Sequence, residues 1–161
     1  MRITAWGLVM AAGLAMLAGD EARAQKRAVP YFASIRSSEA RMRAGPGRNY
    51  PITWRYVRLD LPVKVIDIYQ DWRKIEDPDG AKGWMKKNLL AETRTGMVLG
   101  TIAELRVAPR FDAKLAWRAA PGVVGRLSKC ARGWCYLDVR GRGGYVEANR
   151  LWGVAPDEEL S

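Results

Sequence analysis

The chain has 161 residues, with 27 lysines and arginines against 17 acidic residues and a formal charge of +10. This length suits one domain or two small ones and is too short for a large multidomain enzyme. Hydrophobic residues make up 48%, a composition typical of a folded globular protein. Because the chain contains no histidine, Ser-His-Asp triads, Cys-His dyads and histidine metal sites are excluded. Two cysteines are too few for a four-cysteine zinc site, so we predict no metal and no cofactor.

Residues 1–24 have the pattern of a cleaved signal peptide. Arg2 supplies a positive start, an uncharged apolar run follows, and Ala22-Arg23-Ala24 places small residues at the two positions that a signal peptidase reads. We expect cleavage between Ala24 and Gln25 and export to the periplasm or out of the cell. The apolar run is short against the roughly 20 residues of a spanning helix. Nothing later in the sequence has the pattern of a membrane span, so no stable span is expected after cleavage.

The basic charge belongs to the exported part of the chain. Removal of residues 1–24 takes away two basic and two acidic residues, so the net charge stays at +10. Such a charge can indicate nucleic-acid binding, but an exported protein meets anionic envelope polymers, lipid headgroups or acidic proteins instead. We therefore expect no nucleic-acid partner.

The exported part contains one pattern twice. Three segments recur in the same order at offsets that fall from 63 to 61: Met42-Arg43-Ala44 as Leu105-Arg106-Val107, Trp72–Ile75 as Trp134–Leu137, and Gly83-Trp84-Met85 as Gly144-Tyr145-Val146. Small loop deletions between equivalent strands produce such a drift. We infer a tandem duplication.

Each copy is predicted to be all β. Residues 61–69 are rich in β-branched side chains and residues 72–77 alternate around Ile75, which together indicate a hairpin. Asp77-Pro78-Asp79-Gly80 has the chemistry of a turn, because proline fixes φ and glycine accepts a positive φ. Residues 140–144 are predicted to form the equivalent turn in the second copy. About five short strands in roughly 60 residues, with no amphipathic helix, predict a small, strongly bent barrel.

Both copies carry an ordered set of short motifs. The first has Arg43–Gly47, Leu61-Pro62-Val63, Trp72-Arg73, Asp77–Gly80, Gly83-Trp84 and Asn88–Leu90, and the second has Leu105-Arg106 with Pro109, Cys130 with Trp134-Cys135, Gly144-Tyr145-Val146 and Leu151–Val154. This set resembles the bacterial SH3-like domain family. The resemblance implies two tandem SH3-like β-barrels, over residues 31–92 and 96–154, in a bacterial envelope protein. It also implies a non-catalytic module, and some members of the family bind peptidoglycan.

The two cysteines are predicted to form a structural disulfide. Cys130 and Cys135 lie opposite each other if the chain makes a hairpin with either a two-residue loop at Arg132-Gly133 or a four-residue loop. An oxidising compartment favours the bond. The alternative is a reactive redox pair, but the spacing of four residues differs from the two of a thioredoxin-like centre.

Aromatic and basic side chains are the candidate ligand-binding groups. We assign this role to Tyr50, Trp54, Arg55, Trp72, Arg73 and Trp134, as platforms and charges for sugars or peptide stems. The alternative for the aromatic residues is that they fill the cores of small barrels, which we favour for Trp84, Tyr145 and Trp152. Alternation along a strand places Trp72 and Ile75 on different faces. Arg41, Arg43, Arg48, Arg55 and Arg58 form either a basic patch or a solvated surface.

The leading hypothesis is an exported, non-enzymatic binding module that recognises peptidoglycan or a wall-associated ligand. The alternative is a periplasmic adaptor that binds or regulates an envelope enzyme and has no wall affinity. A third hypothesis is an enzyme with an unusual cysteine or carboxylate mechanism. An exposed aromatic cleft favours the first, a flat apolar patch the second, and a free cysteine of low pKa the third. The sequence sets neither the ligand nor the oligomeric state.

Overall fold

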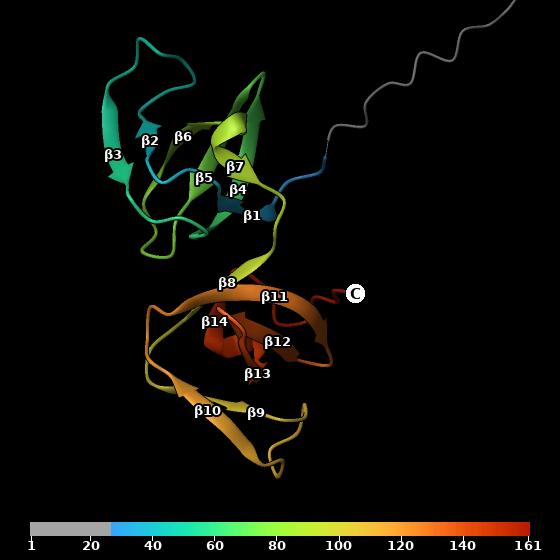
Figure 1. Ribbon diagram of the computed structural model, residues 1–161. Coiled ribbons are helices and arrows are strands. Elements are labelled where there is room, and N and C mark those ends of the chain that lie inside the picture. The colour runs from blue at the N-terminus through green and yellow to red at the C-terminus, as the bar shows by residue number, and fades with distance from the viewer. Residues whose placement is uncertain (1–26) are drawn as a thin grey trace, which may run out of the picture.

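The computed structural model describes residues 27–161, so the predicted signal peptide and the cleavage site between Ala24 and Gln25 lie outside the described residues. The described chain forms two β units stacked end to end (Figure 1). Each unit is a curled antiparallel sheet of seven strands. The prediction of an all-β protein made of two tandem barrels is confirmed.

The first unit contains β1 (Tyr31–Ile35), β2 (Ala40–Arg43), β3 (Ile52–Tyr56), β4 (Pro62–Tyr69), β5 (Trp72–Glu76), β6 (Lys82–Lys86), a 3-10 turn η1 (Lys87–Leu89) and β7 (Leu90–Ala91). The second contains β8 (Thr95–Val98), β9 (Ala103–Arg106), β10 (Leu115–Ala119), β11 (Val124–Ala131), β12 (Trp134–Val139), β13 (Arg142–Glu147), a 3-10 turn η2 (Ala148–Arg150) and β14 (Leu151–Trp152).

The two units have the same topology. The strand order is β3-β2-β6-β5-β4-β1-β7 in the first sheet and β10-β9-β13-β12-β11-β8-β14 in the second, so each strand has a counterpart seven places later. This agreement supports the inferred duplication. The sequence predicted about five strands for each unit, but two-residue strands such as β7 and β14 are too short to show an alternating pattern.

The equivalent positions of the duplicated pattern fill equivalent cores. Ile75 and its counterpart Leu137 are each 0% exposed, and Met85 and its counterpart Val146 are 0% and 1% exposed. Each unit therefore buries its own hydrophobic cluster, which is where most of the stabilisation of so small a domain arises.

Two turn predictions have different outcomes. The turn after β5 is confirmed, because Asp77 Oδ1 accepts hydrogen bonds from the backbone N–H groups of Asp79 and Ala81, at 3.0 and 2.8 Å. The predicted turn at residues 140–144 is too long. Only Arg140 and Gly141 turn, with φ of 54° and 85°, and the next three residues pair with β12. Gly143 is a glycine because the Tyr136 ring lies where its Cβ would be.

The predicted disulfide is present between Cys130 and Cys135, which pair directly across β11 and β12 with Cα atoms 4.1 Å apart. Of the two loop lengths considered, the structure has the two-residue turn at Arg132-Gly133, where both residues have positive φ. Both cysteines are buried in the second core. The bond fits an oxidising compartment.

The two units contact each other through side chains and backbone. Thr95 Oγ1 donates a hydrogen bond to the carbonyl of Asp60 at 2.8 Å, and Arg58 donates one to the carbonyl of Gly122. Phe32 and Trp152 meet edge to face, with ring centroids 5.8 Å apart. Across residues 27–161, no helix has the length and apolar character that a membrane crossing requires.

Candidate ligand-binding site

Each barrel has a hollow at the equivalent place, beside β2 in the first barrel and beside β9 in the second. In the first barrel it measures about 440 Å³ and is lined by Glu39, Arg41, Arg43, Arg48, Trp72, Lys86 and Leu89, which we call the basic hollow. The second hollow measures about 150 Å³ and is lined by Ile102, Ala103, Glu104, Arg106, Phe111, Trp134, Val146, Glu147 and Arg150. The basic hollow is therefore the larger of the two.

Seven of the lining positions correspond between the two hollows, but their charges differ. The arginine of β2 or β9 and the tryptophan of β5 or β12 are present in both. Arg41 is replaced by Glu104, and Lys86 by Glu147. As a result the basic hollow has four cationic side chains against one carboxylate, whereas the second hollow has two against two.

The second hollow is also partly filled and neutralised. Phe111 stands where the first barrel has Arg48, and its ring lies edge-on to Trp134 with centroids 5.0 Å apart. Arg106 and Arg118 both pair with Glu104, at 2.6 and 3.0 Å. The duplication has thus produced one open cationic site and one smaller site of balanced charge.

One arginine fixes the loop above each hollow. Arg43 Nη1 donates to the carbonyls of Arg48 and Tyr50, at 3.0 and 2.7 Å, and its counterpart Arg106 donates to the carbonyl of Ala113 at 2.8 Å. The Tyr50 ring also covers Gly45, where an added Cβ would lie 2.4 Å from a ring carbon. These contacts hold the loop that carries Arg48.

Trp72 is the floor of the basic hollow. Its side chain is 8% exposed and lies beneath Lys86, whose Nζ is 6.0 Å from the ring centroid. Ile75 belongs to the core, so the two residues occupy different faces of β5, as alternation predicted. Arg73 does not line this hollow. Its Nη1 donates to the carbonyls of Gln70 and Trp72, at 2.9 and 3.0 Å, and holds the β4–β5 turn.

Three other candidates lie on or next to β3. Tyr50 and Trp54 are 44% and 54% exposed. Arg55 is exposed and pairs across the strands with Arg41, which places it at the rim of the basic hollow. Trp117, the counterpart of Trp54, is half-buried and donates Nε1 to the carbonyl of Gly143 at 3.2 Å. Trp54 is therefore exposed in the first barrel, whereas Trp117 is held against the second barrel by a hydrogen bond.

Four of the six predicted residues lie in or beside a hollow, and they are divided between the two barrels. Trp72 is in the basic hollow, with Arg55 and Tyr50 close by, while Trp134 lines the second hollow in the other barrel. Lys86 was absent from the predicted site. Its place over Trp72 depends on the β5–β6 register, which pairs the two residues directly. The repeat offset could have found it, since Lys86 and Glu147 stand at matching positions.

The charge and shape of the basic hollow decide which kind of ligand it can bind. Arg48 and Lys86 make no ion pair with another described residue, and Arg41 pairs only with the exposed Glu39 at 3.1 Å. Within residues 27–161, no three acidic or cysteine side chains gather where they could hold a metal ion. The arrangement suits the binding of an anion.

Comparison with known proteins gives the class of the chain. Residues 36–92 and 100–153 each match the sequence model of the bacterial SH3 domain family, and the chain belongs to this family. Domains of the family are generally non-catalytic and bind wall or protein ligands. No curated protein matches the chain.

Several solved structures are similar at low sequence identity. NlpC2 from Trichomonas vaginalis is 13% identical with a TM-score of 0.35, and the match covers 79% of this chain and 49% of that one. NlpC1 from the same organism is 14% identical with a TM-score of 0.34, over 76% and 45%. An NlpC/P60 family protein from Bacillus cereus is 15% identical with a TM-score of 0.35, over 75% and 55%. The chain spans about half the length of these proteins.

Proposed function

We propose that the chain is an exported, non-catalytic binding module of the bacterial cell envelope, and that its first barrel recognises peptidoglycan through the basic hollow. Membership of the bacterial SH3 domain family supports a binding module. The sequence pattern of residues 1–24 and the disulfide between Cys130 and Cys135 support export.

The charge difference between the two hollows carries the proposal. Each barrel needs one arginine for its fold, Arg43 in the first and Arg106 in the second, because this side chain donates hydrogen bonds to carbonyls of the neighbouring loop. It does not need the cations at 41, 48 and 86, because the second barrel has Glu104, Phe111 and Glu147 in their places. Cations that the fold does not require are therefore best explained by a ligand.

The peptide stems of peptidoglycan have the complementary chemistry. They carry carboxylates, and guanidinium groups bind carboxylates through paired, charge-assisted hydrogen bonds. The ring of Trp72, of which only a small part is exposed, gives the hollow an apolar floor for an aliphatic part of a stem. The exposed ring of Tyr50, in the loop that Arg43 holds, can take a sugar face.

The test is co-sedimentation of the exported chain, residues 25–161, with purified, protein-free sacculi across a salt series, with soluble muropeptides as competitors. We expect binding that persists at moderate salt and that muropeptides displace, since nonspecific charge attraction fades with screening. Absent binding, or binding that salt removes completely, would contradict wall recognition and favour the adaptor hypothesis.

A further inference from the structure

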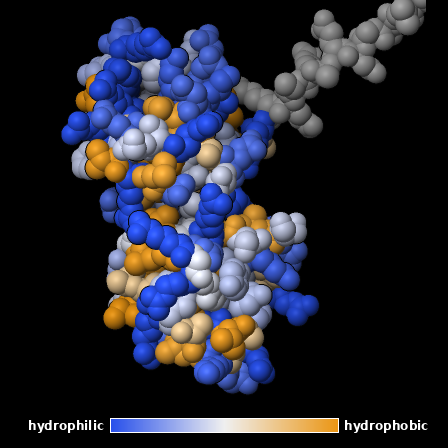
Figure 2. Space-filling view, viewed as in Figure 1, coloured by the Kyte–Doolittle hydropathy of each residue, from blue (hydrophilic) through white to orange (hydrophobic). Residues whose placement is uncertain are grey.

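Exposed apolar side chains are concentrated in one short stretch of the chain. Of the ten large hydrophobic residues that are exposed in the described part, five lie between positions 50 and 59: Tyr50, Ile52, Trp54, Val57 and Leu59. We call this stretch the edge strip. In Figure 2, orange side chains are visible on the side of the upper barrel where Figure 1 places β3. So many exposed apolar side chains in one short segment indicate an interaction site.

The edge strip contains an unpaired strand edge. β3 is the terminal strand of the first sheet and pairs only with β2, so alternate backbone N–H and C=O groups along its outer side have no strand partner. Proteins usually shorten or cover such edges, because they template pairing with another chain. Four of the five residues of β3 are exposed, and the fifth, Tyr56, is the buried anchor at its end.

The counterpart in the second barrel does not have this character. β10 is also a terminal strand, but Leu115 and Trp117, which correspond to Ile52 and Trp54, are half-buried. The hydrogen bond from Trp117 to Gly143 holds that ring against its own barrel. Exposure of the β3 edge is therefore a property of the first barrel and not a requirement of the fold.

The side chains around β3 define what an added strand would carry. Arg55 lies opposite Arg41, and Ile52 lies opposite Arg43, so one face of the β2–β3 ribbon is basic. Trp54 lies opposite the core residue Met42, so its face is apolar. Because side chains of a strand alternate between faces, a segment that pairs with β3 should alternate acidic and apolar residues.

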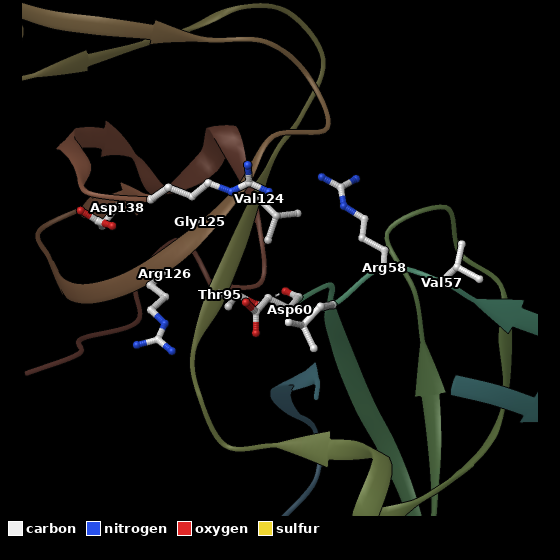
Figure 3. A pocket seen from close by; sticks show the side chains of 10 residues that line it. Val57, Arg58, Asp60, Thr95, Val124, Gly125, Arg126 and Asp138 are labelled. Atoms are coloured by element: carbon white, nitrogen blue, oxygen red, sulfur yellow. Dashed lines mark hydrogen bonds between the residues drawn. The ribbon is translucent and has the colours of Figure 1, made fainter. Parts of the chain in front are cut away.

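The edge strip leads to a cleft of about 630 Å³ between the two barrels (Figure 3). Val57 and Arg58 line it from the first barrel, and Val124 and Arg126 line it from the second. The lining also holds Arg140 and the carboxylates of Asp60 and Asp138, so three arginines stand against two aspartates and the net positive charge favours acidic residues in a segment that continues beyond β3.

We propose that β3 binds an extended segment of a partner protein by strand addition, and that this segment alternates acidic and apolar residues and extends toward Arg58 and Arg126. A second copy of this chain is a poor occupant, because pairing two β3 edges about a twofold axis brings the basic faces of Arg41 and Arg55 together. The edge strip shares Tyr50 with the proposed wall site, but the backbone edge of β3 and Ile52 belong to strand addition alone, so variants at Ile52 and at Arg48 and Lys86 separate the two proposals.

The proposal can be tested with the exported chain and the peptide acetyl-Glu-Val-Glu-Val-Glu-Val-Glu-amide, followed by amide NMR and hydrogen exchange. We expect shifted signals and new protection at alternate residues of β3. Replacing every glutamate with lysine, or N-methylating alternate amides of the peptide, should abolish binding. Ile52→Glu puts a like charge on the face that receives the glutamates and should weaken binding about tenfold, whereas Leu115→Glu, at the matching place on β10, should leave it unchanged.

Each other result would overturn the proposal. No binding of the acidic peptide, or binding that N-methylation or Ile52→Glu leaves intact, excludes strand addition at β3. Binding that depends on Arg48 and Lys86 but not on Ile52 assigns the peptide to the basic hollow. Self-association in sedimentation experiments that Ile52→Glu removes assigns the edge to a second copy. Thermal melting of each variant checks that the exposed substitutions leave the fold intact.

Discussion

The hydroxyl of Tyr56 donates a hydrogen bond to Asp77 Oδ2 at 2.9 Å, and both side chains are buried. Asp77 Oδ1 accepts the two backbone hydrogen bonds that form the turn after β5, so this carboxylate joins the end of β3 to the β5–β6 turn. Burial, and then the hydrogen bond and charge of Asp77, raise the pKa of Tyr56 far above its ordinary value. The second barrel has Ala119 at this position, so the link is specific to the first barrel.

Tyr56→Phe should destabilise the protein by about 1–3 kcal/mol, because it removes one donor from a buried carboxylate. Urea unfolding of the variant measures the change in the free energy of unfolding. Tyr69→Phe serves as the control, since Tyr69 is 51% exposed and should lose little. Equal losses at the two positions would show that the hydrogen bond to Asp77 contributes nothing particular.

The C-terminal segment should be held by a pH-dependent contact. Arg94 donates to both carboxylate oxygens of Glu158, and the backbone N–H of Ala155 donates to Oε2 at 3.0 Å. The hydrogen bond from Arg94, opposed by partial burial, lowers the pKa of Glu158 below its ordinary 4.5. The folded state therefore gains stability above pH 4.5 and loses it as the pH falls through the lowered pKa.

Glu158→Gln should accordingly be less stable than the parent chain at pH 7, by about 1 kcal/mol for a partly exposed pair. In strong acid the difference should disappear, because Glu158 is then protonated in both states. Melting temperatures of both proteins across pH 2–7 test this, with Glu159→Gln at an exposed neighbouring position as the control. A difference that is the same at every pH would contradict the assignment.

The disulfide should stabilise the second barrel without affecting ligand binding. Closing so short a loop contributes about 2 kcal/mol by restricting the unfolded chain. Reduction should therefore lower the melting temperature, while a Cys130→Ala, Cys135→Ala double variant should not respond to reductant. Binding to sacculi should persist after reduction, because Cys130 and Cys135 line neither hollow. Loss of binding at unchanged stability would point instead to a redox role.

The sequence was most informative where residues interact with near neighbours along the chain. The Asp77 turn, the β4–β5 hairpin and the opposition of Cys130 and Cys135 follow from local chemistry, and all are present. The glycine-rich run at 140–144 led to the prediction of a turn that is too long. Gly143 is required because the Tyr136 ring of the neighbouring strand lies where its Cβ would be, and not because of a turn.

The candidate site was harder to predict than the fold. Alternation assigned Trp72 to the face away from the core, but it could not tell that Lys86 covers it. That contact depends on the cross-strand register, which brings together residues far apart in the sequence. The different exposure of Trp54 and Trp117, at matching positions of the repeat, depends likewise on a distant carbonyl, that of Gly143.

An exchange of residues between the two hollows tests the central claim most directly. Arg48→Phe with Lys86→Glu gives the first hollow the residues of the second at these two positions, and Phe111→Arg with Glu147→Lys does the reverse. The measurement is co-sedimentation of both double variants and the parent chain with protein-free sacculi at moderate salt. We predict that the first variant loses binding while the second retains it. Undiminished binding by the first variant would contradict recognition of the wall through the basic hollow.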